Sequence, residues 1–413
     1  MSVNHIVLDK GTIDFMAINP SFTIPMSSPD LTDLERDAVR KVMETPNLSM
    51  GKYLPDFEQA IAEFTGARYA VAVNSGTAGL HLCIRAANIQ PGDLVLTTPF
   101  SFIASTNAIL FEKAIPVFVD AEPRTGNIDV DLLEQAVRDL RAGGAAASRW
   151  LPRRGSQPGG RLKAILSVDV FGQPADYDRI CKIAAENDLI LIEDSCEALG
   201  AEYRGRKAGR FGAYGVFAFY PNKQITTGEG GIIVTDDPQA EQFMRALRSQ
   251  GRAPDDTWLQ HTYLGYNYRM DEMSAALGAA QMMRIEELLT RRERVAAWYN
   301  ERLSKISGIE LPVILPETTR MSWFVYVIRF ENEVRRGAIA RRLDDQGIPV
   351  RPYFSPIHLQ PYMREMFDYR EGDYPVTEDL GGRGVALPFS GVMTEAQVDT
   401  VTRTLASAMK ENR

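Results

Sequence analysis

The sequence predicts an α/β fold: a large domain with a mostly parallel seven-stranded sheet flanked by helices, followed by a smaller C-terminal α/β domain. Short apolar runs alternate with stretches of helical periodicity, which is the pattern of βα units. The runs are apolar throughout, as expected for strands that are covered on both faces of a sheet. After residue 271 this alternation gives way to longer helices and isolated strands.

The predicted elements follow in chain order. Residues 30–62 carry apolar side chains at helical intervals, with breaks near Pro46 and Gly51, and are predicted to form helices. Strands are expected at residues 70–73, 94–97, 116–119, 164–170, 189–192, 216–219 and 232–235. Helices are expected at residues 77–87, 101–110, 130–141 and 176–187. Further on, we expect a long helix at 271–303, strands at 323–330 and 348–353, and helices at 335–346 and 395–409.

The domain boundary is placed where the pattern changes, so that residues 1–270 form the large domain and residues 271–413 the small one. Residues 142–160 interrupt a helix-to-strand connection with small residues, glycines and arginines, a composition typical of an exposed, mobile loop. The arginines of this loop have an alternative role as contacts for an anionic substrate, although a solvated surface loop is preferred; they are Arg149, Arg153 and Arg154.

Composition and charge exclude several classes of protein. With 413 residues, 45% of them hydrophobic and 24% charged, the chain has the composition of a globular protein with a large core. The 46 basic and 54 acidic residues give a net charge of −8, which argues against a protein that coats nucleic acid. No run approaches the roughly 18 apolar residues of a membrane span, and residues 1–10 lack a leader pattern. We therefore expect a cytoplasmic protein without nucleic-acid or membrane partners.

The cysteines and histidines indicate neither disulfides nor a metal. Cys83, Cys181 and Cys196 show no CxxC spacing, which suits reduced thiols. The four histidines are widely spread, and none stands at metal-ligand spacing from another His or Cys. We therefore expect no metal site.

Lys223 is the first candidate for chemistry, in the segment FAFYPNKQITTGEGG at residues 217–231. It follows the carboxyl end of a predicted strand, the edge at which open α/β sheets bind ligands. Partial burial among Phe217, Phe219 and Ile225 disfavours a cationic amine and makes it a usable nucleophile. On spacing alone, an ordinary surface lysine in a glycine-rich turn is an equal alternative.

Asp194 is the second candidate, because the strand predicted at residues 189–192 delivers its carboxylate to the same edge. A pyridoxal ring acts as an electron sink while its nitrogen is protonated, and a fixed carboxylate keeps it so. The alternative role is a helix N-cap, which aspartate also favours.

A third feature is the turn Asn74-Ser75-Gly76-Thr77-Ala78-Gly79, which joins a predicted strand to a helix. Backbone amides at a helix start, together with a hydroxyl, form an anion site. Near it, Phe102 offers an aromatic ring to a flat cofactor, with a core position as the alternative. Successive βα units thus carry a phosphate-binding turn, an aromatic ring, an acid and a lysine. These are the groups that bind pyridoxal phosphate and support its chemistry.

These residues lie in segments that resemble, over nearly the whole chain, the DegT/StrS family of sugar aminotransferases, which are fold-type I pyridoxal phosphate enzymes. The matching segments are GKYLPDFE at Gly51, NSGTAGLHL at Asn74, PFSFIASTNAI at Pro99, IEDSCEALGA at Ile192, FYPNKQITTGEGG at Phe219, LGYNYRMDEMSAALG at Leu264 and YFSPIHLQPYM at Tyr353. The resemblance implies that Lys223 forms the Schiff base and that Asp194 pairs with the pyridine nitrogen. It also implies that Phe102 stacks on the ring, and that Gly76 and Thr77 hold the phosphate.

The same resemblance implies a homodimer with shared active sites, in which Asn267 of the GYNYR motif reaches the phosphate of the cofactor in the other subunit. Arg351 and His358 match a region that approaches the nucleotide sugar. Two positions depart from the family pattern. Glu197 stands beside the cofactor ring where many relatives carry Gln or His, and Ala218 replaces a serine that often contacts the phosphate, so that this contact is absent or comes from another group.

The implied reaction moves an amino group from L-glutamate to the keto group of a nucleotide-linked sugar, giving an amino sugar for cell-surface polysaccharide or glycoconjugate synthesis. Lys223 anchors the cofactor and moves the proton. Two alternatives stay open. A dehydratase on the same scaffold is disfavoured because such relatives replace the lysine with histidine, and a non-catalytic cofactor-binding regulator is disfavoured because no DNA-binding motif is present.

Overall fold

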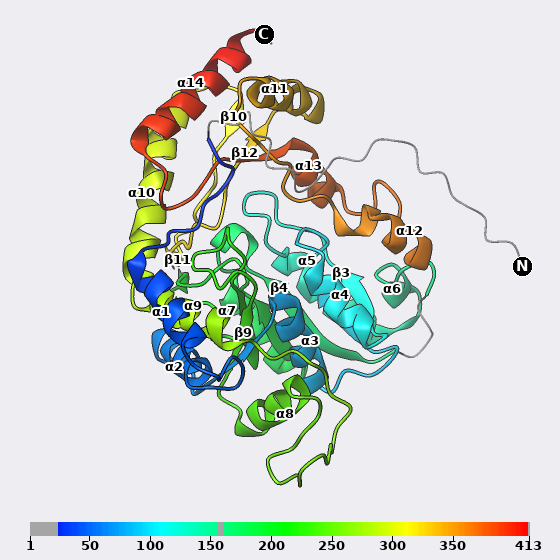
Figure 1. Ribbon diagram of the computed structural model, residues 1–413. Coiled ribbons are helices and arrows are strands. Elements are labelled where there is room, and N and C mark those ends of the chain that lie inside the picture. Colours follow the sequence, from blue (N-terminus) through cyan, green and yellow to red (C-terminus); the bar gives the residue numbers. More distant parts are fainter. Residues whose placement is uncertain (1–23, 156–159, 412–413) are drawn as a thin grey trace, which may run out of the picture.

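The computed structural model describes residues 24–155 and 160–411, and its central layer is a seven-stranded sheet (Figure 1). The strands are β1 (Tyr69–Val73), β2 (Leu94–Thr97), β3 (Ile115–Phe118), β4 (Leu162–Val168), β5 (Ile190–Asp194), β8 (Tyr214–Ala218) and β9 (Gly231–Thr235). They lie in the order β1-β9-β8-β5-β4-β2-β3. β9 is antiparallel to both neighbours and the other pairs are parallel, so the predicted mostly parallel sheet is confirmed.

Helices cover both faces of this sheet. Successive residues of each strand point to opposite faces, so each strand contributes side chains to both helical layers. Val71 and Val73 of β1 pack in one core with helices α3 (Gly76–Ala86) and α8 (Pro238–Arg248), whereas Ala70 and Ala72 pack in another with α2 (Tyr53–Thr65) and α9 (Glu272–Met282). This burial on both faces explains why the strands are apolar throughout. The helices before and within the sheet are α1 (Asp33–Met43), α2 (Tyr53–Thr65), α3 (Gly76–Ala86), α4 (Ala104–Phe111), α5 (Val130–Ala142), α7 (Tyr177–Glu186) and α8 (Pro238–Arg248).

The C-terminal part has its own core and a three-stranded antiparallel sheet in the order β10-β12-β13. A second small sheet joins β11 of this part to the hairpin of β6 and β7, so the two parts of the chain pack closely. The strands are β6 (Glu202–Tyr203), β7 (Arg206–Lys207), β10 (Ile309–Glu310), β11 (Thr318–Arg320), β12 (Tyr326–Phe330) and β13 (Gly384–Leu387). The helices are α9 (Glu272–Met282), α10 (Ile285–Leu303), α11 (Glu333–Asp345), α12 (Pro361–Phe367), α13 (Pro375–Arg383) and α14 (Glu395–Glu411).

Two predicted elements of the C-terminal part are wrong. The long helix is two helices, because the chain breaks after Met282 and directs the Arg284 side chain to Asp30 and Glu35. The strand expected at 348–353 is reduced to one bridge, between Arg351 and Ala386 of β13, because Pro349 and Pro352 have no amide hydrogen to donate.

The segment expected to be an exposed loop, residues 142–160, is largely exposed over its described part but contains a short helix. Residues 144–148 form helix α6 (Gly144–Ser148), and the indole of Trp150 donates to Asp139. Arg153 pairs with Asp373 at 2.6 Å, and Arg154 donates to the carbonyl oxygen of Glu365. The arginines thus dock this segment against the region of α12, while residues 156–159 and the N-terminal residues 1–10 lie outside the described structure.

Among the described residues, no helix is long and apolar enough to cross a membrane.

Candidate active site

The carboxyl ends of β1, β5 and β8 bring together the residues that follow them. β5 and β8 are parallel neighbours with Asp194 opposite Val216, so the turns after both strands share one edge. Gly76 lies against both turns: a Cβ at this position would come within 2.8 Å of the Ala218 Cβ and 3.0 Å of the Cys196 sulfur. Only glycine therefore allows the start of α3 to approach this edge so closely.

Lys223 lies in a loop whose ends are tied together by hydrogen bonds from Phe219 to Gly230 and from Thr227 to Phe219. Its side chain is only 13% exposed. The amine Nζ is 3.8 Å from the centre of the Phe324 ring and 3.7 Å from Oε1 of Glu197. The alternative of an ordinary surface lysine is wrong, because this amine is enclosed between an aromatic ring and a carboxylate.

Glu197 is buried, and its second oxygen, Oε2, accepts a 2.9 Å hydrogen bond from the amide of Phe171. Burial raises the pKa of Glu197 to about 7, and the nearby Lys223 amine acts in the opposite direction. Phe171 itself has a φ of 59°, a left-handed conformation that is uncommon for a bulky residue. This strained backbone aims the Phe171 amide at the acid beside the lysine.

Asp194 is buried at the end of β5, and Ser105 of α4 donates to its Oδ2 at 2.6 Å. Its Oδ1 accepts from the amide of Cys196 at 3.2 Å. No helix begins at this point, because residues 195–200 form turns. The alternative of a helix N-cap is therefore wrong, and Asp194 presents a fixed carboxylate at the sheet edge.

A second buried acid, Asp169, lies next to Asp194 and was not singled out from the sequence. Its amide donates to the carbonyl of Asp194, while its carboxylate accepts from Ser195 at 2.6 Å and from the Tyr177 hydroxyl at 2.7 Å. Burial raises the pKa of Asp169 to about 6, against the lowering effect of these hydrogen bonds. Asp169 thereby braces the turn that carries both Asp194 and Glu197.

The turn after β1 has the predicted form of an anion site. Ser75 is the N-cap of α3, and its hydroxyl accepts from the amide of Ala78 at 3.1 Å. Gly76 and Thr77 are the first two residues of the helix, so their amides have no intrahelical acceptor. The positive end of the helix dipole adds to the attraction of a phosphate to these amides.

Phe102 lies three residues before Ser105, the residue that donates to Asp194. Its side chain is 63% exposed, unlike that of Phe100, which is buried in the core. The alternative of a core position is therefore wrong for Phe102, whose ring is free to lie on a flat ligand.

Asn267 lies in an extended segment that packs on α3. The rings of Tyr266 and Tyr268 on either side of it stack at 4.8 Å, and the Tyr268 hydroxyl lies 3.1 Å from His81 of α3. Because alternate side chains of an extended segment face opposite sides, Asn267 points outward, and it is exposed. Its backbone carbonyl accepts from the Asn74 side chain at 3.3 Å.

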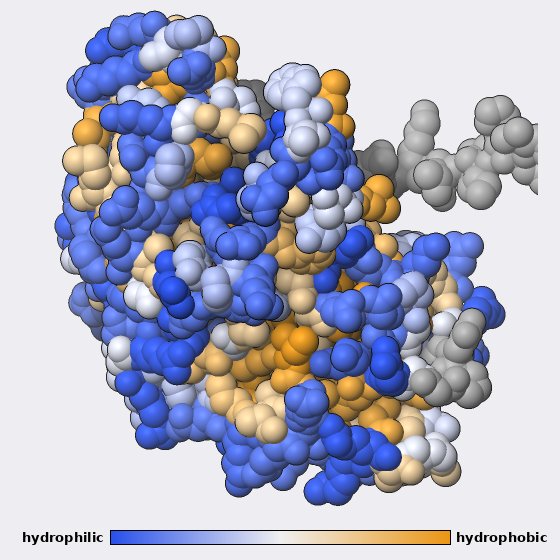
Figure 2. Space-filling view, turned by 90° about the horizontal axis from the view of Figure 1, so that it is seen from below, coloured by the Kyte–Doolittle hydropathy of each residue, from blue (hydrophilic) through white to orange (hydrophobic). Residues whose placement is uncertain are grey.

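The loop between α8 and α9 carries apolar side chains on the same part of the surface. Trp258 is 83% exposed, Leu264 is 81% exposed and Leu259 is 68% exposed. The loop lies at the bottom of Figure 1, and Figure 2, seen from that side, shows apolar residues gathered across the middle of the face. Beside the loop lies a pocket of about 540 Å³ with four arginines in its wall, which are Arg245, Arg248, Arg252 and Arg269.

Arg351 and His358 differ in accessibility. Arg351 is exposed and donates to the carbonyl of Val350. His358 is fully buried and its Nε2 donates to Oε1 of Glu378 at 2.9 Å, and its other ring nitrogen has no partner among the described residues. Burial lowers the pKa of His358. The His358 side chain has no exposed surface in this structure, and the approach of its segment to a nucleotide sugar stays a prediction.

The sequence interpretation missed Tyr353, although it begins a segment that was singled out. Its ring centre lies 6.1 Å from that of Phe171 and 6.2 Å from that of Phe324, the two residues around Glu197 and Lys223. Burial raises the pKa of Tyr353. No local signal distinguishes Tyr353 from a core tyrosine, because its neighbours are distant in sequence.

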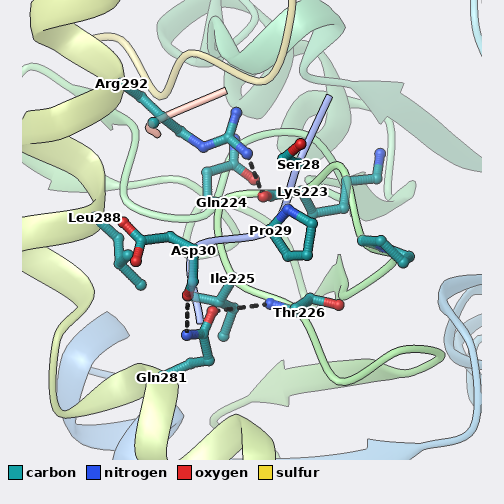
Figure 3. A pocket seen from close by; sticks show the side chains of 12 residues that line it. Ser28, Pro29, Asp30, Lys223, Gln224, Ile225, Thr226, Gln281, Leu288 and Arg292 are labelled. Carbon is teal, nitrogen blue, oxygen red and sulfur yellow. Dashed lines mark hydrogen bonds between the residues drawn. The ribbon is translucent and has the colours of Figure 1, made fainter. Parts of the chain in front are cut away.

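Behind the lysine lies a small pocket, shown in Figure 3. Arg292 and Leu288 enter it from α10, Gln281 from α9, and Asp30 from the N-terminal segment. Its volume is about 10 Å³, room for a single water and not for a cofactor. The Lys223 side chain extends away from Arg292, and its amine lies beside Phe324 and Glu197 instead.

Comparison with known proteins gives consistent matches over nearly the whole chain. The model of the DegT/DnrJ/EryC1/StrS aminotransferase family matches residues 29–406. The GDP-perosamine synthase of Caulobacter vibrioides is 36% identical over 385 residues, covering 92% of this chain and 97% of that protein.

Two solved structures have the same fold. DesV of S. venezuelae, in complex with a ketimine intermediate, aligns with a TM-score of 0.82 and 30% identity, covering 93% of this chain and 98% of that one. PseC of Helicobacter pylori, an aminotransferase involved in the biosynthesis of pseudoaminic acid, aligns with a TM-score of 0.83 and 26% identity, covering 94% and 99%.

Proposed function

Because the chain belongs to the DegT/DnrJ/EryC1/StrS aminotransferase family, we propose that it uses pyridoxal phosphate to place an amino group on the keto group of a nucleotide-linked sugar. The family and the fold-type I architecture predicted from the seven sequence segments are confirmed. One observation carries the proposal: a buried lysine, a buried carboxylate and an open helix N-terminus meet at one edge of the sheet.

The residues at this edge fit pyridoxal phosphate. The open amides of Gly76 and Thr77 suit the phosphate, and the buried Asp194 carboxylate suits a protonated ring nitrogen. The exposed ring of Phe102 suits the flat face of the cofactor. When bound, pyridoxal phosphate supplies an electron sink for the carbon that loses its proton.

We assign to Lys223 the covalent attachment of the cofactor and the transfer of the proton during the reaction. Its position between Phe324 and Glu197 limits the directions in which the amine moves. Glu197 is placed to share a proton with this amine at 3.7 Å. Ser105 and the Cys196 amide hold the Asp194 carboxylate in one orientation, which keeps it directed at the ring nitrogen.

We propose L-glutamate as the amino donor and cell-surface polysaccharide or glycoconjugate synthesis as the use of the product. The identity to a GDP-perosamine synthase supports a nucleotide-linked sugar as the acceptor. Arg351, which is exposed, is proposed to contact this substrate. His358 is proposed to hold the same segment in place through its hydrogen bond to Glu378, and not to contact the sugar itself.

The active enzyme is proposed to be a homodimer in which Asn267 reaches the cofactor phosphate of the other subunit. The outward direction of Asn267 and the exposed apolar loop beside it support an interface on this face. The boundary between a large domain at residues 1–270 and a small domain at 271–413 is likewise proposed. The nucleotide-linked substrate and the free thiols support a cytoplasmic location.

The direct test is turnover of the purified enzyme, with L-glutamate as donor and a panel of nucleotide-linked keto sugars as acceptors. We expect an amino sugar and oxoglutarate in equal amounts, and no product with Lys223→Ala. Loss of a sugar hydroxyl without amine transfer would instead favour the dehydratase. Tight cofactor binding without turnover of any acceptor would favour the regulator.

A further inference from the structure

Arg292 lies behind the reactive lysine and directs its guanidinium group at backbone carbonyls. Nη1 donates to the carbonyl oxygens of Trp323 at 3.1 Å and Phe324 at 3.2 Å. Nη2 donates to those of Asn222, at 3.0 Å, and Lys223. One planar group thus joins the loop of the lysine to the segment that contains Phe324, as Figure 3 shows for the Lys223 carbonyl.

The charge of Arg292 has no matching acid. The side chain is 4% exposed, and among the described residues no carboxylate lies within ion-pair distance of it. Arg284 and Arg291 on the same side of the molecule both pair with Asp30, so an acid lies near but is used by others. Burial lowers the pKa of Arg292 to about 10. An unpaired buried cation is costly, so its presence calls for a role beyond packing.

The four carbonyl groups that accept from Arg292 belong to residues close to the Lys223 amine. Two of them flank the Lys223 backbone, and a third belongs to Phe324, whose ring lies 3.8 Å from Nζ. Gln224 strengthens the same connection, because its amide donates to the carbonyls of Glu197 at 2.6 Å and Ser322 at 3.1 Å. The lysine backbone, the segment that carries the Phe324 ring and the residue that carries the acid are therefore connected by one set of hydrogen bonds.

We propose that Arg292 is a positioning residue, which clamps the Lys223 backbone and the Phe324 ring so that the amine returns to the same place after each release. This inference rests on the proposed role of Lys223. The lysine side chain has four rotatable methylene groups, so the position of its amine is only as reproducible as the backbone that carries it. Small displacements of a reacting group cost large factors in rate.

The test compares Arg292→Lys and Arg292→Met with the matched control Arg291→Met in the full-length enzyme. Arg291 is the adjacent residue of α10 and pairs with Asp30 and Glu287 without any recorded bond to the lysine loop. We expect both Arg292 variants to lower kcat about 10- to 100-fold while KM changes less than about 3-fold. Arg291→Met is expected to keep a kcat close to that of the wild type.

A second measurement does not depend on turnover. The cofactor-free enzyme is treated with acetic anhydride, and acetylation of Lys223 is followed by mass spectrometry of its peptide, together with hydrogen exchange of residues 222–227. We expect the Arg292 variants to exchange these amides at least about 10-fold faster and to change the acetylation rate of Lys223, because the loop is released. The control variant is expected to leave both rates unchanged.

The possible outcomes separate the inference from the proposed function. Folded Arg292→Met with wild-type kcat and wild-type exchange rates overturns the inference, even if its thermal stability falls. If Arg292→Met does not fold, a folded Arg292→Lys with unchanged kcat and exchange rates has the same consequence. Wild-type enzyme without amino transfer contradicts the proposed function, whereas the exchange and acetylation measurements still decide whether Arg292 positions Lys223.

Discussion

Oε1 of Glu197 lies 3.7 Å from Nζ of Lys223, and both side chains are largely buried. Burial raises the pKa of Glu197 from 4.5 to about 7, although the amine opposes this change. The folded protein therefore binds a proton at Glu197 at pH values where the unfolded chain does not. The ionisation of Glu197, beside Lys223, therefore affects the stability of the protein.

The first prediction concerns the pH dependence of stability. Because the pKa of Glu197 is raised on folding, its favourable contribution is complete below pH 4.5 and is lost as the pH rises through about 7. Glu197→Gln cannot titrate, so its free energy of unfolding should fall less steeply with pH across this window. Urea unfolding of the cofactor-free protein at several pH values measures the slope. An identical slope in both proteins would show that folding does not raise the pKa of Glu197.

Two other buried acids also contribute to the pH dependence of stability. Burial also raises the pKa of Asp169 to about 6 and that of Glu193 to about 8, so Glu197→Gln should retain part of the slope. Lys223→Met removes the amine that opposes the shift at Glu197, and the window in which stability falls should extend to higher pH.

The second prediction is that Asp194→Ala lowers kcat at least about 100-fold while the fold remains, because the ring nitrogen loses its fixed carboxylate. Steady-state kinetics and circular dichroism measure the two effects. Ser105→Ala is the matched control and should have a smaller effect, since the Cys196 amide still holds Asp194. Global unfolding of Asp194→Ala with normal cofactor affinity in the remaining folded protein would point to a purely structural aspartate.

The site residues that could be predicted from the sequence each lie at the end of a strand or shortly after it. Asp194 ends β5, Gly76 opens the helix after β1, and Lys223 follows β8, so an apolar run and the residues just beyond it were sufficient. The neighbours of these residues come from elsewhere in the chain. Phe171 and Phe324 enclose the lysine and its acid through tertiary packing, which no local pattern encodes.

The elements show the same limit. The seven strands of the large sheet were predictable because burial on both faces leaves a continuous apolar run. The strand expected at residues 348–353 makes only one bridge, from Arg351 to Ala386 of β13, because Pro349 and Pro352 lack amide hydrogens. An apolar run therefore predicts a buried segment, but its backbone forms a ladder only where amide donors are present.

The third prediction concerns Glu272, which joins two segments that were singled out separately in the sequence. Its buried carboxylate accepts hydrogen bonds from the amides of Gly51, Tyr53 and Leu54 at 2.9, 2.7 and 3.2 Å. Glu272→Ala leaves these amides at the start of α2 without acceptors and should lower the free energy of unfolding by about 2–4 kcal/mol. Glu287→Ala, at a half-exposed position on α10, should lower it by less than about 1 kcal/mol. Denaturant titration measures both values, and equal losses would contradict a special role for Glu272.

The fourth prediction tests whether the sites are shared between subunits. Asn267→Ala should weaken cofactor binding, because the cofactor phosphate of the other subunit loses a hydrogen-bond donor. It should have little effect on folding, since the side chain is exposed and the Asn74 contact uses the Asn267 backbone. Fluorescence titration of the cofactor-free enzyme measures the affinity.

Mixing two variants gives the sharper form of this test, at a cofactor concentration too low to saturate Asn267→Ala, so that each variant alone has little activity. In a hybrid dimer of Lys223→Ala and Asn267→Ala subunits, one site combines the intact lysine of the second subunit with the intact Asn267 of the first. Refolding an equal mixture should therefore restore activity well above the mean of the separate variants. A control mixture of the double variant Lys223→Ala/Asn267→Ala with Asn267→Ala lacks every complete site and should stay inactive. If the first mixture gains nothing although hybrids form, Asn267 acts within its own subunit, and its outward direction serves another purpose.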